Sequence, residues 1–279
     1  MTEQINLDAV GQELEPMVYE YGTRDVILYH LGLGMGRDQL PFTYERSLRV
    51  LPSFAVVPPF PAMSGCVSML KANPMMILHG EQAFELHRPI PVSGKLTTSG
   101  RIEGIYDKGK GASVVLRTDT VDDRDRQLFS NRFTLFVRGA GGFGGEAGPR
   151  EPVREMPDRA PDQVLETPTR EDQALLYRLS GDYNPLHADP EFAKLAGFDT
   201  PILHGLCTYG IACWGVLEAC AEMQPERMKS FQGRFSSPVF PGETLVTEIW
   251  ADGDEALFQT RVKERDVVAL TRGHARFAD

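Results

Sequence analysis

The sequence has few cysteines, and their spacing does not match a metal site or a disulfide framework. The four are Cys66, Cys207, Cys213 and Cys220. Three of them fall within one predicted helix, without a C-x-x-C pair or a second cluster, so a zinc site and paired disulfides are both disfavoured. We expect buried free thiols in a reducing compartment, and no bound metal.

Positive charge is also scarce. The chain has 29 Lys and Arg residues against 39 Asp and Glu residues, which gives a formal net charge of −10. A general nucleic-acid binder needs a basic face for the phosphates, so the composition argues against that class. A small phosphorylated ligand remains compatible, because a few local cations are enough to bind it.

Long hydrophobic runs are absent as well. No stretch approaches the roughly 18 uninterrupted apolar residues of a membrane span. The N-terminus lacks the basic and then apolar pattern of a signal peptide, and the final residues, RFAD, are not a peroxisomal address. These features predict a cytoplasmic protein without a membrane partner.

The 279 residues can form one large domain or two of about 100–150 residues. The clearest boundary is residues 139–168, which begin GAGGFGGEAGPREP and show no periodicity. This composition is typical of a surface linker. We therefore predict an N-terminal half at 1–138 and a C-terminal half at 169–279.

The two halves repeat an order of elements. The sequence Ile-Leu-His-Gly occurs at 77–80 and again at 202–205. Each copy precedes a turn with Pro and Gly and then a long strand. Each also follows a helix with a predicted threonine cap, at Thr23 and Thr169. Several features in one order indicate an internal duplication.

Runs rich in Val, Thr, Phe and Leu follow both copies, and short turns between them predict antiparallel strands. These runs lie at 95–107, 111–122, 126–138, 229–236, 243–252, 256–263 and 267–277. Only the second half has a long apolar helix, predicted at 206–223. The corresponding stretch of the first half, 54–78, is interrupted by prolines. The pattern predicts two sheet-around-helix units, the first with its helix shortened or missing and with a groove for an apolar chain.

The residues suited to chemistry gather at 177–190. A helix from Thr169 should end near Ser180-Gly181, and a short helix capped by Asp189 should start at Pro190. The connection between them carries an acid, an amide and an imidazole, which acid–base catalysis can use if they converge. These are Asp182, Asn184 and His187. Taken singly, each also has a structural interpretation: a loop cap, a turn former and a packing histidine.

This segment resembles the hydratase 2 motif of the MaoC-like family. The similar run is LSGDYNPLHADP at 179–190, followed by AGFDTPILHGLC at 196–207. Matching flanks extend over nearly the whole chain, and they resemble most the hydratase domain of peroxisomal multifunctional enzymes of type 2. The resemblance implies an α+β double hot-dog fold with the N-terminal central helix largely lost.

The resemblance also implies a reaction, the reversible syn addition of water to a trans-2-enoyl-CoA, which yields a (3R)-3-hydroxyacyl-CoA without a further cofactor. Asp182 and His187 would activate the water, Asn184 would orient it, and the backbone N–H of Gly205 would bind the thioester oxygen. The remaining matches imply contacts to the CoA thioester. They are His79, Gly80, Lys108, Tyr183 and Phe235.

Other interpretations predict different reactions. G-x-G-x-x-G at 139–144 and Tyr-x-x-x-Lys at 106–110 suggest a nicotinamide-dependent dehydrogenase, but no helix is predicted after the glycines. A hot-dog thioesterase, a non-catalytic acyl-CoA binding protein, and a zinc enzyme using His187, His204 and Asp189 are further alternatives. Assembly as a homodimer is expected by analogy with hot-dog folds.

Overall fold

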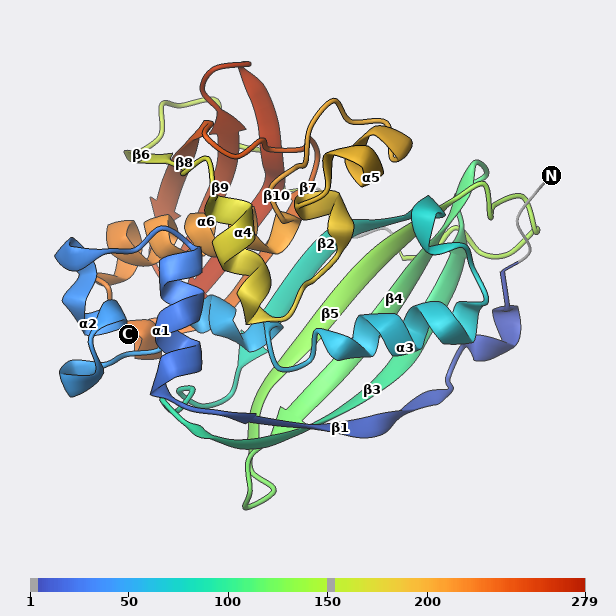
Figure 1. Cartoon of the computed structure of the whole chain (residues 1–279), viewed down its shortest axis with the longest axis horizontal. Helices are drawn as coiled ribbons and strands as arrows, with labels where there is room; N and C mark the ends of the chain where they lie inside the picture. The colour runs from blue at the N-terminus through green and yellow to red at the C-terminus, as the bar shows by residue number, and fades with distance from the viewer. Residues whose placement is uncertain (1–4, 150–153, 279) are drawn as a thin grey trace.

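A computed structural model describes residues 5–149 and 154–278. Over these residues the strands form one sheet of ten, in the order β1-β3-β4-β5-β2-β7-β10-β9-β8-β6, with antiparallel neighbours (Figure 1). The strands are β1 (Glu13–Tyr21), β2 (Ile77–Leu86), β3 (Gly94–Asp107), β4 (Gly111–Val121), β5 (Gln127–Arg138), β6 (Gln163–Pro168), β7 (Met228–Phe235), β8 (Thr244–Asp252), β9 (Glu255–Val262) and β10 (Val267–Phe277).

Helices and short 3₁₀ turns lie between the strands. The α-helices are α1 (Thr23–Gly32), α2 (Leu40–Thr43), α3 (Pro61–Leu70), α4 (Gln173–Tyr177), α5 (Pro190–Leu195) and α6 (Gly205–Ala221). The 3₁₀ turns are η1 (Leu7–Ala9), η2 (Arg37–Gln39), η3 (Glu45–Ser47), η4 (Pro52–Val56), η5 (Pro74–Met76), η6 (Arg178–Ser180), η7 (Pro185–His187) and η8 (Pro225–Arg227).

The strand order confirms the predicted double hot-dog fold. Read from the two edges inward, the order β1-β3-β4-β5-β2 of the first half corresponds to β6-β8-β9-β10-β7 of the second. The halves meet where β2 pairs with β7. Helix α3 packs on the first half and α6 on the second, so each half is a sheet with its own helix.

The two helices differ in length as the sequence predicts. Helix α6 has 17 residues, most of them buried, whereas α3 has 10. Close packing of α6 depends on a glycine, because a Cβ at Gly210 would lie 2.6 Å from the Leu33 side chain of the segment that follows α1. The shorter α3 buries only Ala62, Cys66 and Leu70. The first sheet therefore leaves room beside its helix that the second sheet does not have.

The seven predicted strands are confirmed to within one or two residues, but three strands lie outside those ranges. Strand β1 lies at the sheet edge, and β2 contains the first Ile-Leu-His-Gly copy. Strand β6 is made by the last six residues of the segment predicted to be linker, and it pairs with β8. Residues 150–153 of that linker lie outside the described residues.

Two expectations behind the duplication are wrong. The first Ile-Leu-His-Gly copy begins strand β2, whereas the second lies in the loop that leads into α6, so the copies are not structurally equivalent. Neither threonine caps a helix with its side chain. Gly22 is the N-cap of α1, and the Thr169 hydroxyl donates to the Glu243 carbonyl instead. The strand order, and not these residues, is therefore the evidence for an internal duplication.

The segment Pro52–Leu70 has the length and apolar composition of a membrane-crossing helix, with a mean hydropathy of 1.4. In the fold this segment comprises the short turn η4 and helix α3, and 56% of its window is buried inside the protein. Pro58, Pro59 and Pro61 separate the two pieces. Its apolar side chains therefore serve the protein core.

The centre of the sheet opens at one end. Strand β2 pairs with β7 only from Glu81 to Glu85, opposite Arg234 to Ser230. Before Glu81, β2 continues beside β5 alone, with an irregular register around Gly80. Beyond Phe235, the chain leaves β7 as a loop. A cavity is lined by residues 77–80 on one side of this opening and by 236–239 on the other.

Candidate active site

The loop between α4 and α5 is held by its own polar side chains. Gly181, at φ +123, ends the helical segment as predicted. The Asp182 carboxylate accepts the Asn184 backbone N–H at 3.1 Å, and the Asn184 side-chain oxygen accepts the Leu186 N–H at 3.1 Å. Asp189 caps α5, as the sequence predicts. The Asn184 oxygen therefore forms a turn, and only its amide NH₂ remains to contact a ligand.

Asp182 and His187 converge on one small volume. One ligating atom of each, together with one of His204, lies within 4.8 Å of the others. A single water molecule can hydrogen-bond to two acceptors at this separation. His187 is buried, and its Nδ1 lies 2.8 Å from the Ile202 carbonyl oxygen. Because a carbonyl only accepts, Nδ1 carries the proton and Nε2 is the acceptor in the neutral ring.

Burial moves the pKa values of the two groups toward each other. Desolvation raises the pKa of the Asp182 carboxyl above its ordinary 3.8, although the nearby His187 and the Asn184 N–H oppose that rise. Desolvation lowers the pKa of His187 below its ordinary 6.5, against the attraction of Asp182. A carboxyl group with a raised pKa and an imidazole with a lowered pKa are suited to exchanging a proton with a bound water.

His204 contacts both members of this pair. Its ring stacks on the His187 ring with centroids 3.8 Å apart, and its Nε2–H donates to the Asp182 carbonyl at 3.1 Å. Burial lowers the pKa of His204 to about 2, so the ring is neutral. As the N-cap of α6, it joins the loop to the helix start.

Arg178 is a site residue that the sequence analysis misses. Its guanidinium donates to the Tyr183 carbonyl at 3.2 Å and lies 5.0 Å from the centre of the Tyr183 ring. It also lies close enough to Asp182 to stabilise the charged carboxylate. No residue pattern singles out this arginine, because the contact depends on how the chain turns back at Gly181.

Gly205 begins α6 beside the pair. Among the described residues no partner accepts its backbone N–H, as expected for the first residue of a helix. A Cβ at this position would lie 3.1 Å from the Phe235 ring. The absence of a side chain therefore keeps the N–H accessible between the helix and Phe235, where the positive end of the helix dipole favours a developing negative charge.

If the reaction is the hydration that the resemblance implies, Gly205→Ala should lower its kcat by up to about 10²-fold, because the added methyl displaces either Phe235 or the helix start by a fraction of an ångström. Steady-state kinetics of the folded variant measures this effect. Gly215→Ala, in the same helix, places its Cβ 3.4 Å from Leu165 and serves as the control with near-normal activity. Equal losses in both variants would show that helix packing, not the N–H, is responsible.

All nine residues proposed for the site line one cavity of about 1690 Å³. His79 and Phe235 lie on opposite sides of the opening in the sheet, with ring centroids 4.9 Å apart. The buried Nε2 of His79 has no protein partner among the described residues. Lys108 donates to the Ala147 carbonyl at the far end of the cavity. Tyr183 lies over Arg178 and remains largely exposed.

Asp182, His187 and His204 could also hold a metal ion by their spacing. The alternative zinc set of His187, His204 and Asp189 loses one member, since the Asp189 carboxylate caps α5. The remaining donors are an acid already bonded to the Asn184 N–H and two histidines stacked face to face. Stacked rings do not direct their nitrogens to one tetrahedral centre, so the arrangement fits zinc poorly.

Removal of metals should therefore leave the activity unchanged. We expect full hydratase activity after extended dialysis against EDTA, and no gain on adding Zn²⁺. A loss on dialysis that Zn²⁺ restores would show that these three side chains act as ligands.

The G-x-G-x-x-G motif at 139–144 does not have the structure of a dinucleotide-binding site. Residues 139–149 form a loop with no helix, and the Asp107 carboxylate accepts the N–H groups of Gly109, Gly142 and Gly144. Those N–H groups are occupied by a side chain of the protein itself. They do not form the phosphate-binding helix start of a dinucleotide site.

Comparison with known families supports the resemblance from both halves. Residues 19–139 match the family model of the MFE-2 hydratase 2 N-terminal domain, and residues 152–272 match that of the MaoC like domain. The chain is 45% identical to 3-hydroxyacyl-thioester dehydratase Y of Mycobacterium tuberculosis, over 94% of this chain and 93% of that protein. It is 42% identical to the peroxisomal enoyl-CoA hydratase 2 of Arabidopsis thaliana, over 94% of this chain and 92% of that one.

A solved structure agrees with these relatives. The MaoC-like dehydratase of Phytophthora capsici is 36% identical, with a TM-score of 0.90 over 98% of each chain. Similarity at this level extends through the sheet, the two helices and the loop that carries Asp182 and His187. The chain belongs to the MaoC-like hydratase 2 family of hydro-lyases.

Proposed function

We propose that this protein is an (R)-specific 2-enoyl-CoA hydratase. The observation that carries the proposal is the meeting of three groups at one cavity. One carboxylate oxygen of Asp182 and one ring nitrogen of His187 lie within 4.8 Å of each other, and the N–H of Gly205, at the start of α6, has no partner among the described residues. Relatives named as an enoyl-CoA hydratase and a hydroxyacyl-thioester dehydratase support the same reaction.

The geometry gives each group a task. A water that donates its two hydrogens to the Asp182 carboxylate and to His187 Nε2 presents a lone pair to C3 of the enoyl thioester. As the O–C3 bond forms, the π electrons move toward the thioester oxygen, where the Gly205 N–H stabilises the enolate. The pair takes one proton from the water and returns it to C2. This delivers both parts of water from one side, without an added cofactor.

The acyl chain has an apolar path from this point. Phe60, Met63 and Val67 line the cavity at the start and along one side of α3, and Leu186 and Phe198 line it as well. The sequence predicts a groove in the first half because its helix is short, and we place that groove beside α3. We propose that the acyl chain lies there, and that its end determines which chain lengths fit.

The experiment is a spectrophotometric assay with trans-2-enoyl-CoAs of increasing chain length, followed by chiral analysis of the product. We expect loss of the conjugated thioester absorbance and formation of the (3R)-3-hydroxyacyl-CoA. Formation of the (3S) product would contradict the site assignment. Release of free CoA thiol would instead indicate a thioesterase, and binding without turnover would indicate a non-catalytic acyl-CoA binding protein.

The compartment and the assembly belong to the same proposal. We propose a cytoplasmic homodimer with no nucleic-acid or membrane partner, since the chain is acidic and its apolar segment Pro52–Leu70 packs partly in the core. Analytical ultracentrifugation tests the dimer, and cell fractionation tests the compartment.

A further inference from the structure

Cations gather around this cavity although the protein is acidic. Among the described lining residues are six Lys or Arg side chains and three carboxylates, in a chain of net charge −10. The cations are Lys108, Lys110, Arg132, Arg154, Arg234 and Arg272. A cavity that concentrates positive charge in an acidic protein favours an anionic ligand.

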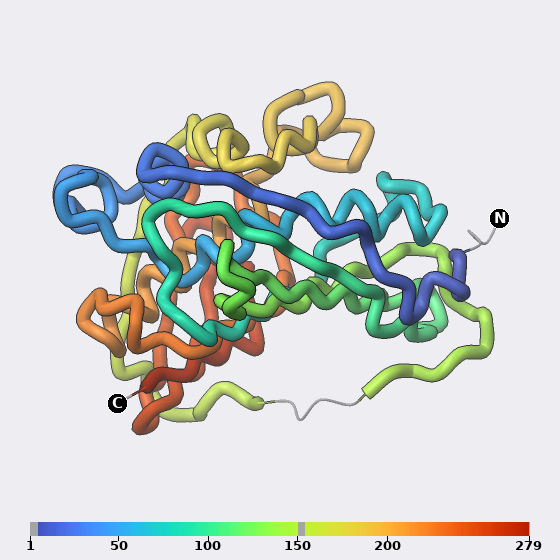
Figure 2. Tube along the Cα trace, turned by 90° about the horizontal axis from the view of Figure 1, so that it is seen from below, coloured from blue at the N-terminus to red at the C-terminus, as the bar shows by residue number. Residues whose placement is uncertain are grey.

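These cations lie toward the face of the sheet opposite α3. Val114 and Leu135 pack under α3, whereas their neighbours Val115 and Thr134, which point the other way, line the cavity. Figure 2 shows the described parts of the connection from β5 to β6, residues 139–149 and 154–162, lying along this second face. The cavity therefore passes through the opening between β2 and β7, with the acyl groove on one face of the sheet and the cations on the other.

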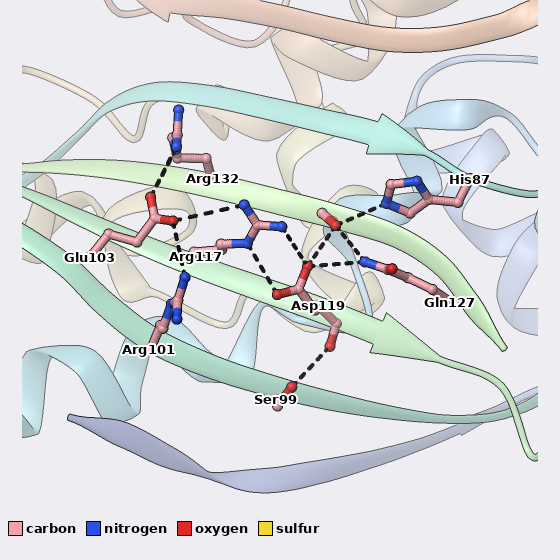
Figure 3. Close-up of polar contacts among 9 residues, drawn as sticks. His87, Ser99, Arg101, Glu103, Arg117, Asp119, Gln127 and Arg132 are labelled. Atoms are coloured by element: carbon pink, nitrogen blue, oxygen red, sulfur yellow. Dashed lines mark hydrogen bonds and ion pairs between the residues drawn. The ribbon is translucent and has the colours of Figure 1, made fainter. Parts of the chain in front are cut away.

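Two of the arginines already have acidic partners. Arg132 pairs with Glu103 at 3.1 Å, within the polar network on the outer face of β3, β4 and β5 (Figure 3). Arg234 lies 3.7 Å from Glu81 across the β2–β7 pair. The network holds these side chains in place, and it partly neutralises their charge.

Arg272 is different, because it has no hydrogen-bond or ion-pair partner among the described residues. It lies in a β-bulge, where the pairing of β10 with β7 skips from Thr271 to His274. Its φ is +53°, a left-handed conformation that is costly for arginine. The bulge is fixed by Gly273, since a Cβ there would lie 2.2 Å from the Phe258 carbonyl oxygen.

We propose that Arg272 binds a phosphate of the nucleotide portion of the CoA substrate. The bulge turns this guanidinium out of the regular strand alternation and into the cavity, beside Arg234. A guanidinium that lacks a carboxylate partner is free to make two parallel hydrogen bonds to phosphate oxygens. This inference rests on the proposed function, and it assigns the role to a residue on the face opposite the acyl groove.

The test compares one acyl group on three carriers. We expect Arg272→Gly to raise KM for a trans-2-enoyl-CoA about tenfold or more, with kcat within about twofold of wild type. With the pantetheine and N-acetylcysteamine thioesters, which lack the nucleotide, wild type and variant should have equal kcat/KM. Glycine relieves the left-handed strain, so the variant should melt no earlier than wild type, and Arg272→Lys should recover part of the affinity.

Arg276→Ala is the matched control, since this arginine lies on the same strand with its side chain largely exposed and outside the cavity. It should leave KM for the CoA substrate unchanged. An unchanged KM in Arg272→Gly, or an equal loss with all three carriers, would overturn the proposal while wild-type hydration stands. Failure of the wild-type enzyme to hydrate any enoyl thioester would instead contradict the proposed function.

Discussion

Asp182→Asn is expected to lower kcat for enoyl-CoA hydration by about 10²–10⁴-fold. The substitution keeps the size of the side chain and an oxygen for the Asn184 N–H, so the loop should stay in place. It removes the carboxylate that accepts a hydrogen from water and can take its proton. KM should change little, because the thioester contacts lie elsewhere in the cavity. Steady-state kinetics on the purified, folded variant measures both values.

The control for this variant is Asp189→Asn. That aspartate is seven residues further along, and its side chain caps α5. Asparagine is also a good N-cap, so stability and activity should both stay near wild type. If the two variants lost activity to the same extent, the loss would reflect the folding of the loop and not the chemistry of position 182.

His187→Gln is expected to have a loss of the same order, about 10²–10⁴-fold in kcat, because the glutamine amide lacks the basic ring nitrogen that takes a proton from the water. Since the two side chains hold one water, their effects should not add. The double variant Asp182→Asn with His187→Gln should be about as slow as the slower single variant. Losses that multiply would show that the two residues act in separate steps.

The pH profile gives a second measurement on the same pair. Water activation requires both acceptors unprotonated. Burial raises the pKa of Asp182 above 3.8 and lowers that of His187 below 6.5, so the acid limb of kcat/KM should lie above pH 3.8, with the His187 part of the limb below pH 6.5. The Asp182 anion raises the pKa of His187, so Asp182→Asn should move the limb to lower pH. A limb above pH 6.5 that persists in Asp182→Asn, where only the imidazole is left to titrate, would mean that His187 is not desolvated.

Much of the fold can be predicted from alternation and turns. Alternating apolar residues predict the strands that follow each Ile-Leu-His-Gly copy. Helical periodicity predicts the long helix at 205–221, and the prolines before residue 75 predict that its counterpart in the first half is short. Strand β1 is harder, because its half-exposed edge position gives it no continuous apolar face. Strand β6 is not predicted, because its six residues follow a Pro- and Asp-rich stretch that is typical of a linker.

Part of the candidate site can likewise be predicted from the sequence, and part cannot. A motif on one short loop predicts that Asp182 and His187 lie close together, since they are joined by only four residues with Pro185 among them. Contacts made across the fold leave no such signal. The stacking of His204 on His187 and the bulge at Arg272 each depend on chain segments that meet only in three dimensions, and the position of Arg178 over Tyr183 depends on the path of the turn at Gly181.

The most direct measurement is a crystal structure of the protein with a bound (3R)-3-hydroxyacyl-CoA. The account predicts that the 3-hydroxyl oxygen occupies the position of the added water, within hydrogen-bond distance of both the Asp182 carboxylate and His187 Nε2. The thioester oxygen should accept the Gly205 N–H. A product whose hydroxyl contacts neither side chain, or whose thioester carbonyl points away from α6, would contradict the assignment of these residues.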